Sequence, residues 1–303
     1  MRVLVTGGAG FLGRAVVGLF ERQGYEVIAP RSKDYDLRRQ GAVGRLLNDA
    51  GPEVVVHLAA AVGGLAANIS SPGRFLYENA VMGLELMEQS RSYGVRKFVG
   101  VGTACMYPDD APIPLREDTV WDGYPAPATA PYGIAKRLLM AQGQAYRDQV
   151  GFDAIFLIPT NLYGPGDNFD LVTAHVVPAL VRRFSQAAWQ GEPRVELLGS
   201  GTDTREFLFV DDAAEAIVAA AQQYDGRDPV NIGTGVETPI AELADMIATA
   251  YGFEGEVVWN ESLAGGTTRR CLDVSRAAEL FGFRATTPLD EGLAETIAWY
   301  EGA

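Results

Sequence analysis

Short apolar runs alternate with longer segments of helical periodicity through the first half of the chain. The apolar runs predict strands at Val3–Thr6, Tyr25–Ala29, Glu53–Ala59, Lys97–Val101 and Asp153–Ile158. Apolar residues at helical spacing predict helices at Phe11–Arg22, Ala42–Ala50, Gly73–Tyr93 and from about Tyr132 onward. Because strands and helices alternate with short links, we expect an α/β fold with a doubly wound parallel sheet and right-handed crossovers.

The pattern loosens after Pro159, where a loop rich in Pro, Gly, Asn and Asp covers residues 159–172. Further along, the spacing predicts helices at Ala174–Gln186, Asp212–Gln223 and Ile240–Tyr251, and strands at Val195–Leu198 and Glu206–Val210. The stretch Gly255–Arg270 is expected to be irregular. We interpret this half as a smaller mixed α/β lobe over the carboxyl edge of the sheet, with residues 206–223 and 229–233 returning to that sheet.

The chain is strongly acidic, with a formal net charge of −14, and it contains 48% hydrophobic and 21% charged residues. These proportions are typical of a soluble globular protein. The negative charge argues against a nucleic acid or an anionic membrane surface as a partner. A small anionic ligand is compatible with it, because arginine side chains bind phosphate through paired hydrogen bonds.

The two cysteines, Cys105 and Cys271, form no CxxC pair. Neither a disulfide framework nor a zinc site is therefore predicted, and we expect no bound metal. The apolar stretch Met1–Thr6 is too short for a signal peptide, and no run of about 18 apolar residues follows it. These features predict a cytoplasmic protein without a membrane segment.

Glycines at a fixed spacing follow the first strand and open the first helix. Gly7, Gly10 and Gly13 lie three residues apart, where a tight turn and a close backbone approach to pyrophosphate are needed. A plain glycine turn is the alternative. We predict a dinucleotide-binding Rossmann domain over residues 1–165 and a C-terminal substrate-binding lobe over residues 166–303.

The end of the second predicted strand bears on the choice between NAD and NADP. An acidic residue there binds the ribose 2′-hydroxyl of NAD. Here the strand continues into Arg31, Ser32 and Lys33, which suit a 2′-phosphate, so NADP is favoured over NAD. A solvated basic turn is the alternative. Asp36 arrives later and is expected to face the adenine.

Tyr132 and Lys136 are four residues apart at a predicted helix start, and so they share one face of that helix. A nearby ammonium favours tyrosinate. We therefore expect Lys136 to lower the pKa of Tyr132 and to make its phenol a usable acid or base near neutrality. An exposed pair without chemistry is the alternative.

These motifs resemble those of the extended short-chain dehydrogenases and reductases, which combine Tyr-x-x-x-Lys with an upstream Ser or Thr. The matching hydroxyl is that of Thr103, in the segment GTACMYP after the strand Lys97–Val101. Within that family the chain resembles the GDP-L-fucose synthases. The similar stretches fall in order and cover most of the chain to about residue 275, at residues 59–64, 102–108, 159–169, 175–184, 199–201, 205–207 and 231–235.

The resemblance implies an activity. Such enzymes epimerise C3 and C5 of GDP-4-keto-6-deoxymannose and then reduce the C4 ketone with NADPH. It implies that Thr103 and Tyr132 stabilise the enolate, and that Cys105 and His175 remove and return protons at C3 and C5. His57, in a buried strand, is expected to be structural.

The resemblance also implies the binding residues. The three glycines and the residues that follow the second strand are expected to contact the cofactor. Further residues expected to contact it are Phe11, Leu12, Leu58, Ala59, Ala60, Tyr132, Lys136, Pro159, Asn161, Leu162 and His175. Those expected to contact the nucleotide sugar are Asn161, Arg183, Arg205 and Arg270. Asn79 is expected to support Lys136 through water. A homodimer with a four-helix interface is expected by analogy alone.

The resemblance has departures that keep alternatives open. Thr103 and Ala104 replace the usual Ser-Ser, and Leu198 stands where tryptophan is common. A redox-neutral, NAD-dependent epimerase resembling GDP-mannose 3,5-epimerase is one alternative, because its active-site segment also runs Ala-Cys. A C4 reductase without epimerase activity is another. A non-catalytic dinucleotide sensor is less compatible with the Tyr132–Lys136 pair, and no feature favours a purely structural role.

Overall fold

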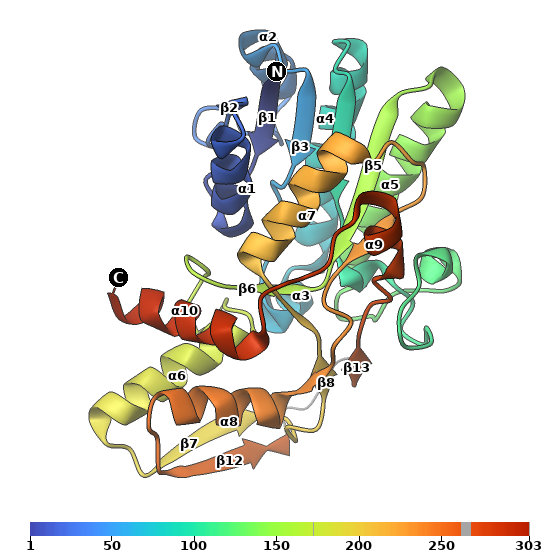
Figure 1. The fold of residues 1–303 in the computed structure, drawn as a ribbon. Coiled ribbons are helices and arrows are strands. Elements are labelled where there is room, and N and C mark those ends of the chain that lie inside the picture. The colour runs from blue at the N-terminus through green and yellow to red at the C-terminus, as the bar shows by residue number, and fades with distance from the viewer. Residues whose placement is uncertain (172, 262–267, 303) are drawn as a thin grey trace.

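Six parallel strands form the central sheet, in the order β10-β5-β4-β3-β1-β2 (Figure 1). The structure is a computed structural model that describes residues 1–171, 173–261 and 268–302. The strands are β1 (Arg2–Thr6), β2 (Glu26–Ile28), β3 (Val54–His57), β4 (Lys97–Val101), β5 (Asp153–Pro159) and β10 (Val230–Ile232). This arrangement confirms the predicted α/β fold with a doubly wound parallel sheet. The strand order reverses around β1, and open α/β sheets bind ligands at the carboxyl ends of the strands at such a point.

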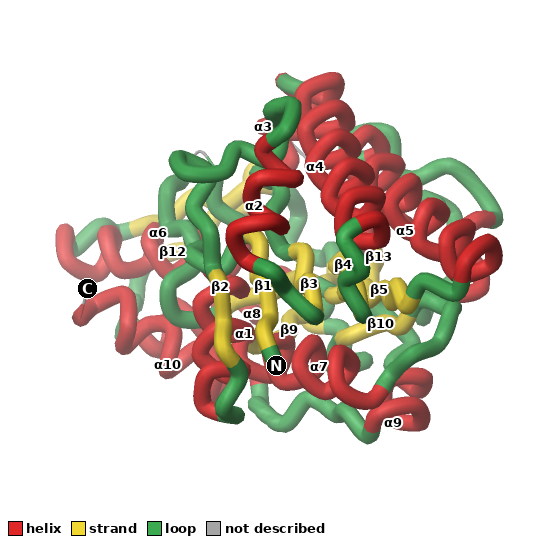
Figure 2. The backbone as a smooth tube through the Cα atoms, turned by 90° about the horizontal axis from the view of Figure 1, so that it is seen from above, coloured by secondary structure: helices red, strands yellow, loops and turns green. Residues whose placement is uncertain are grey.

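Helices cover both faces of this sheet (Figure 2). One face carries α2 (Ala42–Ala50), α4 (Pro72–Ser92) and α5 (Ala130–Val150). The other carries α1 (Phe11–Arg22), α7 (Val210–Gln223) and α9 (Ser275–Phe281). Shorter helices lie in the connections, namely α3 (Leu65–Ser70), η1 (Ala104–Met106) and η2 (Glu117–Trp121).

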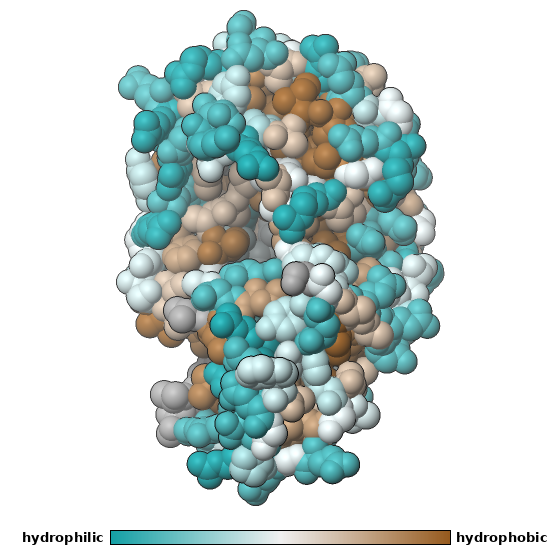
Figure 3. Space-filling view, turned by 90° about the vertical axis from the view of Figure 1, so that its left-hand side faces the viewer, coloured by the Kyte–Doolittle hydropathy of each residue, from teal (hydrophilic) through white to brown (hydrophobic). Residues whose placement is uncertain are grey.

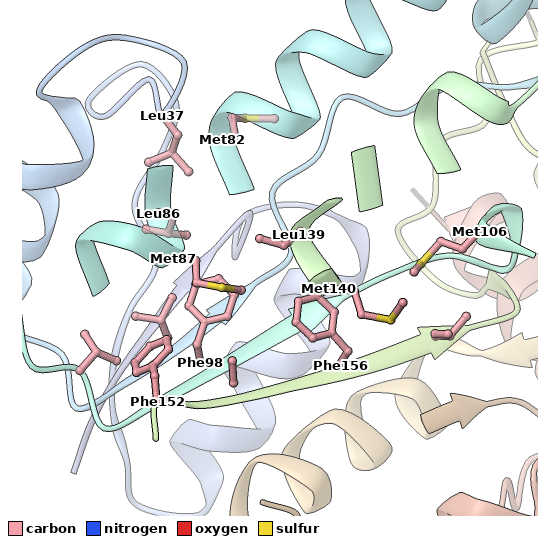
Figure 4. Close-up of a cluster of buried hydrophobic side chains, with 14 of the residues drawn as sticks. Leu37, Met82, Leu86, Met87, Phe98, Met106, Leu139, Met140, Phe152 and Phe156 are labelled. Atoms are coloured by element: carbon pink, nitrogen blue, oxygen red, sulfur yellow. The ribbon is translucent and has the colours of Figure 1, made fainter. Parts of the chain in front are cut away.

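Apolar side chains of α4, α5, β4 and β5 meet on the first of these faces (Figure 4). Leu86 and Met87 of α4 pack with Leu139 and Met140 of α5 and with Phe98 of β4, and none of the five is more than 2% exposed. Burial of such side chains stabilises a fold by about 1.5–3 kcal/mol each. The packing fixes α5 against the sheet, and it therefore fixes the position of the Tyr-x-x-x-Lys motif at the start of that helix.

A second lobe lies beyond the carboxyl ends of the strands (Figure 1). Its helices are α6 (Val176–Gln190), α8 (Ile240–Ala250) and α10 (Leu289–Gly302). Two pairs of strands lie in it, β7 (Arg194–Leu198) with β12 (Glu256–Asn260) and β6 (Asn161–Tyr163) with β9 (Phe207–Phe209). A third small sheet has β8 (Thr204–Arg205) between β11 (Thr238–Pro239) and β13 (Arg269–Arg270). Figure 3 shows the face of the molecule that lies on the left in Figure 1. This face is mainly hydrophilic, and it is hollowed between the six-stranded sheet with its helices and the second lobe. No helix in the described ranges is long and apolar enough to span a membrane.

The C-terminal half differs from the sequence prediction in several places. The single strand predicted at Glu206–Val210 is replaced by β8 and β9, on either side of Glu206, and β9 pairs with β6 instead of the six-stranded sheet. The stretch predicted to be irregular, 255–270, contains β12 and β13, while its residues 262–267 lie outside the described part. The sequence pattern does not predict α9 or α10.

Candidate active site

A tight glycine turn joins β1 to the N-terminus of α1. Gly7 has a φ of +74°, and a Cβ atom added there would lie 2.7 Å from the backbone nitrogen of Ala59. A Cβ atom at Gly13 would lie 2.1 Å from the carbonyl oxygen of Gly7. Gly10 is exposed, and it begins the helix without a side-chain cap. Uncapped N–H groups at a helix N-terminus attract anions, so this turn fits the pyrophosphate of a dinucleotide. Phe11 and Leu12, the first residues of the helix, are partly exposed beside it.

The carboxyl end of β3 lies beside this turn. His57 is 1% exposed, and its Nδ1 is 2.8 Å from Oγ1 of Thr6. Burial, and to a smaller degree the charge of Lys136, lowers the pKa of His57 to about 3, so the imidazole is neutral. These contacts support the structural role predicted for His57. The partly exposed residues that follow the strand, and that were predicted to contact the cofactor, are Leu58, Ala59 and Ala60.

Asn79 of α4 holds the loop after β3. Its Oδ1 accepts the N–H of Ala61 at 3.0 Å, and its Nδ2 donates to the carbonyl oxygens of Ala61 and Phe75 at 2.9 and 2.7 Å. Nζ of Lys136 donates instead to the carbonyl oxygen of Val101 at 2.9 Å. The amide of Asn79 thus hydrogen-bonds to Ala61 of the loop and to Phe75 of its own helix, and support of Lys136 through water stays a prediction.

The basic residues after β2 are exposed at the same edge of the sheet. In the described ranges, no side-chain hydrogen bond or ion pair engages Arg31, Ser32 or Lys33. Asp36 receives a hydrogen bond from Nε of Arg38 at 2.8 Å, which lowers the pKa of its carboxyl group. Arg31, Ser32 and Lys33 can therefore contact an added phosphate group. The carboxylate of Asp36 is ionised and accepts its hydrogen bond from the guanidinium of Arg38.

Tyr132 and Lys136 lie on successive turns at the start of α5, with Nζ of Lys136 5.9 Å from the centroid of the Tyr132 ring. Burial lowers the pKa of Lys136 to about 8. Burial also raises the pKa of Tyr132, and the charge of Cys105 raises it further. The predicted lowering of the Tyr132 pKa by Lys136 is thus wrong for this structure, because burial disfavours the phenolate. The phenol stays protonated and can donate a proton.

The segment after β4 carries Thr103 and Cys105 towards the start of α5. Oγ1 of Thr103 accepts the N–H of Cys105 at 3.2 Å and caps η1. A Cβ atom at Gly133 would lie only 2.2 Å from the carbonyl oxygen of Cys105. Glycine therefore allows α5 to approach η1 closely, which brings Thr103, Cys105 and Tyr132 into one region. The sequence reasoning misses Gly133, although its place between Tyr132 and Lys136 is a usable signal.

Two arginines from different strands of the lobe meet beside Cys105. Arg205 of β8 and Arg270 of β13 are register partners in a parallel pair. Nη1 of Arg270 donates to Sγ of Cys105 at 3.4 Å. Burial lowers the pKa of Arg205, and the charge of Arg270 lowers it further. Two partly desolvated guanidinium groups that repel each other form a site that an anion would stabilise.

Glu206, which the sequence reasoning also misses, fixes the segments that carry these arginines. The side chain is fully buried. One carboxylate oxygen accepts the N–H groups of Thr234 and Gly235 at 2.6 and 2.9 Å, and the other accepts the N–H of Leu272 at 2.7 Å. The carbonyl oxygen of Glu206 accepts a hydrogen bond from Nδ2 of Asn161 at 2.9 Å. An acidic residue inside an apolar strand is the sequence signal for this role.

His175 begins α6 as an exposed N-cap residue. Burial raises the pKa of Asp167, and the charge of His175 lowers it in part. Oδ2 of Asp167 has no hydrogen-bond partner among the described residues. Nη2 of Arg14, from α1, donates to the carbonyl oxygen of Gly166 at 2.8 Å. This hydrogen bond ties the loop before His175 to the glycine turn. Asp167 is a further residue near the site that the sequence reasoning misses.

The remaining predicted residues are more dispersed. Pro159 ends β5 in a buried position, and Leu162 of β6 packs against the apolar cluster under α7. Nη1 of Arg183 donates to the carbonyl oxygen of Glu196 on β7 at 3.2 Å. Nη1 of Arg205 donates to the carbonyl oxygens of Thr204 and Thr268 at 2.7 and 3.4 Å, which belong to other segments than Glu196. The described residues also contain no group of three His, Cys, Asp or Glu that could hold a metal ion.

Comparisons with known proteins agree with this geometry. Residues 3–233 match the NAD dependent epimerase/dehydratase family. A probable GDP-L-fucose synthase 1 of Oryza sativa is 39% identical over 301 residues, covering 99% of this chain and 92% of that protein. A GDP-L-fucose synthetase of Naegleria fowleri bound to NADP superposes with a TM-score of 0.91 at 28% identity, covering 99% of this chain and 94% of that one. A GDP-6-OMe-4-keto-L-xylo-heptose reductase of C. jejuni superposes with a TM-score of 0.94 at 28% identity, covering 99% and 97%.

Proposed function

The chain belongs to the NAD dependent epimerase/dehydratase family, and we propose that it is an NADPH-dependent epimerase and reductase of a GDP-linked 4-keto-6-deoxysugar. The observation that carries the proposal is the meeting of Thr103, Cys105, Tyr132 and Lys136 with a pair of arginines at the sheet edge that holds the glycine turn. Relatives that match nearly the whole chain are named GDP-L-fucose synthase, which supports the same activity.

The cofactor is NADP(H), held at the turn formed by Gly7, Gly10 and Gly13, with its 2′-phosphate near Arg31, Ser32 and Lys33. Bound NADPH supplies the hydride that reduces C4 of the sugar. The exposed basic side chains after β2 suit NADP better than NAD, because an added phosphate is a dianion. An NADP-bound relative of the same fold supports this choice.

The residues of α5 and η1 complete the reduction. In our proposal, Tyr132 donates its proton to the C4 oxygen as hydride arrives at C4, so that the O–H bond of the phenol breaks and that of the sugar alcohol forms. The raised pKa of Tyr132 keeps this proton in place before the reaction. Thr103 donates a hydrogen bond to the same oxygen, and the ammonium of Lys136 compensates the phenolate that is left.

The epimerisation needs groups that remove and return protons at C3 and C5. These carbons lie next to the C4 ketone, so the electron pair of a broken C–H bond passes to the C4 oxygen and forms an enolate. We assign the two proton carriers to Cys105 and His175. A thiolate accepts the proton as S–H, and a proton from the other group reaches the opposite face of the carbon.

The diphosphate of the substrate is assigned to Arg205 and Arg270, whose mutual repulsion it would relieve. We assign Arg183, which donates to the backbone of β7, to the nucleotide. We assign Asn161, which donates to the carbonyl oxygen of Glu206, to a position between cofactor and sugar. A second candidate function is a C4 reductase without epimerase activity. It is favoured by the match to the C. jejuni heptose reductase, which superposes over 99% of this chain.

We also propose that the enzyme is a cytoplasmic homodimer. Helices α4 and α5 pack side by side and expose Leu76, Tyr77 and Leu138, which are 36%, 63% and 43% exposed. Apolar side chains on two adjacent helices suit a four-helix interface with a second copy. The two cysteines are free, which fits a reducing compartment.

The experiment that tests the function follows NADPH absorbance with a panel of nucleotide-linked 4-keto-6-deoxysugars. We expect oxidation of one NADPH per sugar, fastest with the GDP-linked compound. Tyr132→Phe is the matched variant, and it should lower the rate by about 10²–10⁴-fold, the usual contribution of a general acid. Unchanged NADPH with every sugar would reject the proposal. An NMR spectrum of the product, with inverted or retained C3 and C5, separates the two candidate functions.

A further inference from the structure

Cys105 and Arg270 lie 165 positions apart in the sequence but meet in the site. Nη1 of Arg270 donates to Sγ of Cys105 at 3.4 Å, and both side chains are partly buried. A fixed positive charge next to sulfur favours thiolate over thiol, because the anion gains an electrostatic partner in a site with little water. Arginine suits this task, since its guanidinium stays protonated throughout the working range of pH.

We propose that Arg270 is a positioning residue that keeps Cys105 in the thiolate form before the substrate arrives. Its effect passes through the sulfur, which is the group that takes a proton from carbon. The inference rests on the proposed function for the identity of that proton. The contact between the guanidinium and the sulfur is a property of the protein itself, so it can be tested with no sugar present.

The backbone holds Arg270 in place for this contact. Strand β13 pairs with β8, which places Arg270 opposite Arg205. Two residues later, the N–H of Leu272 donates to the buried carboxylate of Glu206 at 2.7 Å. The carbonyl oxygen of Cys271 accepts the N–H of Leu115 at 2.8 Å. The segment is therefore fixed immediately after Arg270 on two sides.

Other charged groups act on Cys105 from the elements packed around it. Arg205 of β8 interacts electrostatically with the sulfur and favours the thiolate, while the protonated phenol of Tyr132 on α5 adds no charge. Asp109 and Asp110 line a cavity of about 230 Å³ that Arg270 also lines, and a negative charge there would disfavour a thiolate nearby. Arg269 lines the same cavity, but its guanidinium is 2.7 Å from the carboxylate of Glu237. Of these groups, Arg270 is the one whose hydrogen bond reaches the sulfur.

The test measures alkylation of the ligand-free full chain by iodoacetamide between pH 6 and 9, with mass spectrometry resolving Cys105 from Cys271. Cys271 is the internal reference, because it is 5% exposed and burial raises its pKa. We expect Arg270→Gln to slow the alkylation of Cys105 about tenfold at pH 7, because the thiolate loses the guanidinium beside it. The midpoint of the rate curve should move to higher pH.

Matched variants make the result specific. Arg270→Lys keeps the charge and should stay within threefold of the unmodified chain, a rescue that a purely structural role does not predict. Arg269→Gln removes the same charge from the neighbouring residue of β13 and should leave the curve unchanged. Melting temperatures accompany each curve, and Arg270→Met serves if Arg270→Gln unfolds. Overlapping curves for Arg270→Gln and the unmodified chain would overturn the inference, as would equal slowing by Arg269→Gln.

Failure of this inference can be told apart from failure of the proposed function. If the unmodified chain oxidises NADPH with a 4-keto sugar while Arg270→Gln alkylates normally, only the role of Arg270 is rejected. If the alkylation curves separate as expected but no sugar is turned over, the thiolate contact stands and the proposed function fails.

Discussion

Tyr132 and Lys136 show how burial acts on two neighbouring titratable groups with opposite charges. Burial disfavours the charged form of each, so the pKa of the lysine falls to about 8 and that of the tyrosine rises. The spacing of the two residues is visible in the sequence, but the degree of enclosure is not. Sequence reasoning therefore places the pair correctly at the start of a helix and gives the wrong direction for the Tyr132 pKa.

The stability of Lys136→Met should depend on pH in a predictable direction. Below about pH 8 the ammonium is charged in both folded and unfolded chains, and its burial opposes folding in full. Between about pH 8 and 10.4 the unfolded chain binds more protons, so this cost is relieved as pH rises. Relative to the unmodified chain, Lys136→Met should therefore be less stable at pH 9 than at pH 7 by roughly 1 kcal/mol.

Urea unfolding of both proteins at the two pH values measures this difference. The hydrogen bond from Lys136 to Val101 is lost at both pH values in the variant, since the amine keeps N–H donors in either protonation state. The same stability difference at pH 7 and pH 9 would show that the buried amine is not the source. Reduction of a 4-keto sugar should be lost in this variant at either pH.

At the scale of elements, the close approach of α5 to η1 builds the site. Gly133 makes this approach possible, because a Cβ atom there would lie 2.2 Å from the carbonyl oxygen of Cys105. We expect Gly133→Ala to push the start of α5 away and to lower kcat at least tenfold, with a loss of roughly 1–3 kcal/mol in stability.

NADPH binding separates this effect from general damage. The glycine turn lies at the start of a different helix, so Gly133→Ala should weaken NADPH binding only through the contacts of Tyr132 and Lys136, and by less than it lowers kcat. Gly73→Ala in α4 is the matched control, since a Cβ atom there meets no atom within 4 Å. Full kcat in Gly133→Ala, or an equal loss in Gly73→Ala, would contradict this account of the helix position.

The regular elements of the sheet were predictable because their apolar runs are local signals. The predicted strand at Lys97–Val101 and the helix at Phe11–Arg22 match β4 and α1 residue for residue. The break between β8 and β9 was not predictable, because it depends on hydrogen bonds that Glu206 accepts from segments distant in sequence. Strand β12 was missed for a similar reason, as it pairs with β7 some 60 residues earlier.

At the scale of the whole molecule, the site lies between two parts of the chain that the sequence separates widely. Thr103, Cys105 and Tyr132 come from the parallel sheet and its helices, whereas Arg205 and Arg270 come from the lobe. The Tyr-x-x-x-Lys motif predicted Tyr132, and the resemblance predicted Thr103, Cys105 and the two arginines. The hydrogen bond from Arg270 to Cys105, which joins the two groups, could be found only in the folded structure. In the proposed site, these arginines supply the local positive charge that a diphosphate needs on a chain with a net charge of −14.

The central claim is that one site exchanges protons at C3 and C5 and delivers hydride to C4. Its most direct test is the NMR spectrum of the product formed from the GDP-linked 4-keto-6-deoxysugar and unlabelled NADPH in D2O. We predict deuterium at C3 and C5, taken from solvent, and hydrogen at C4, taken from NADPH. A product with hydrogen at all three carbons, or one with deuterium at C4, would contradict the account.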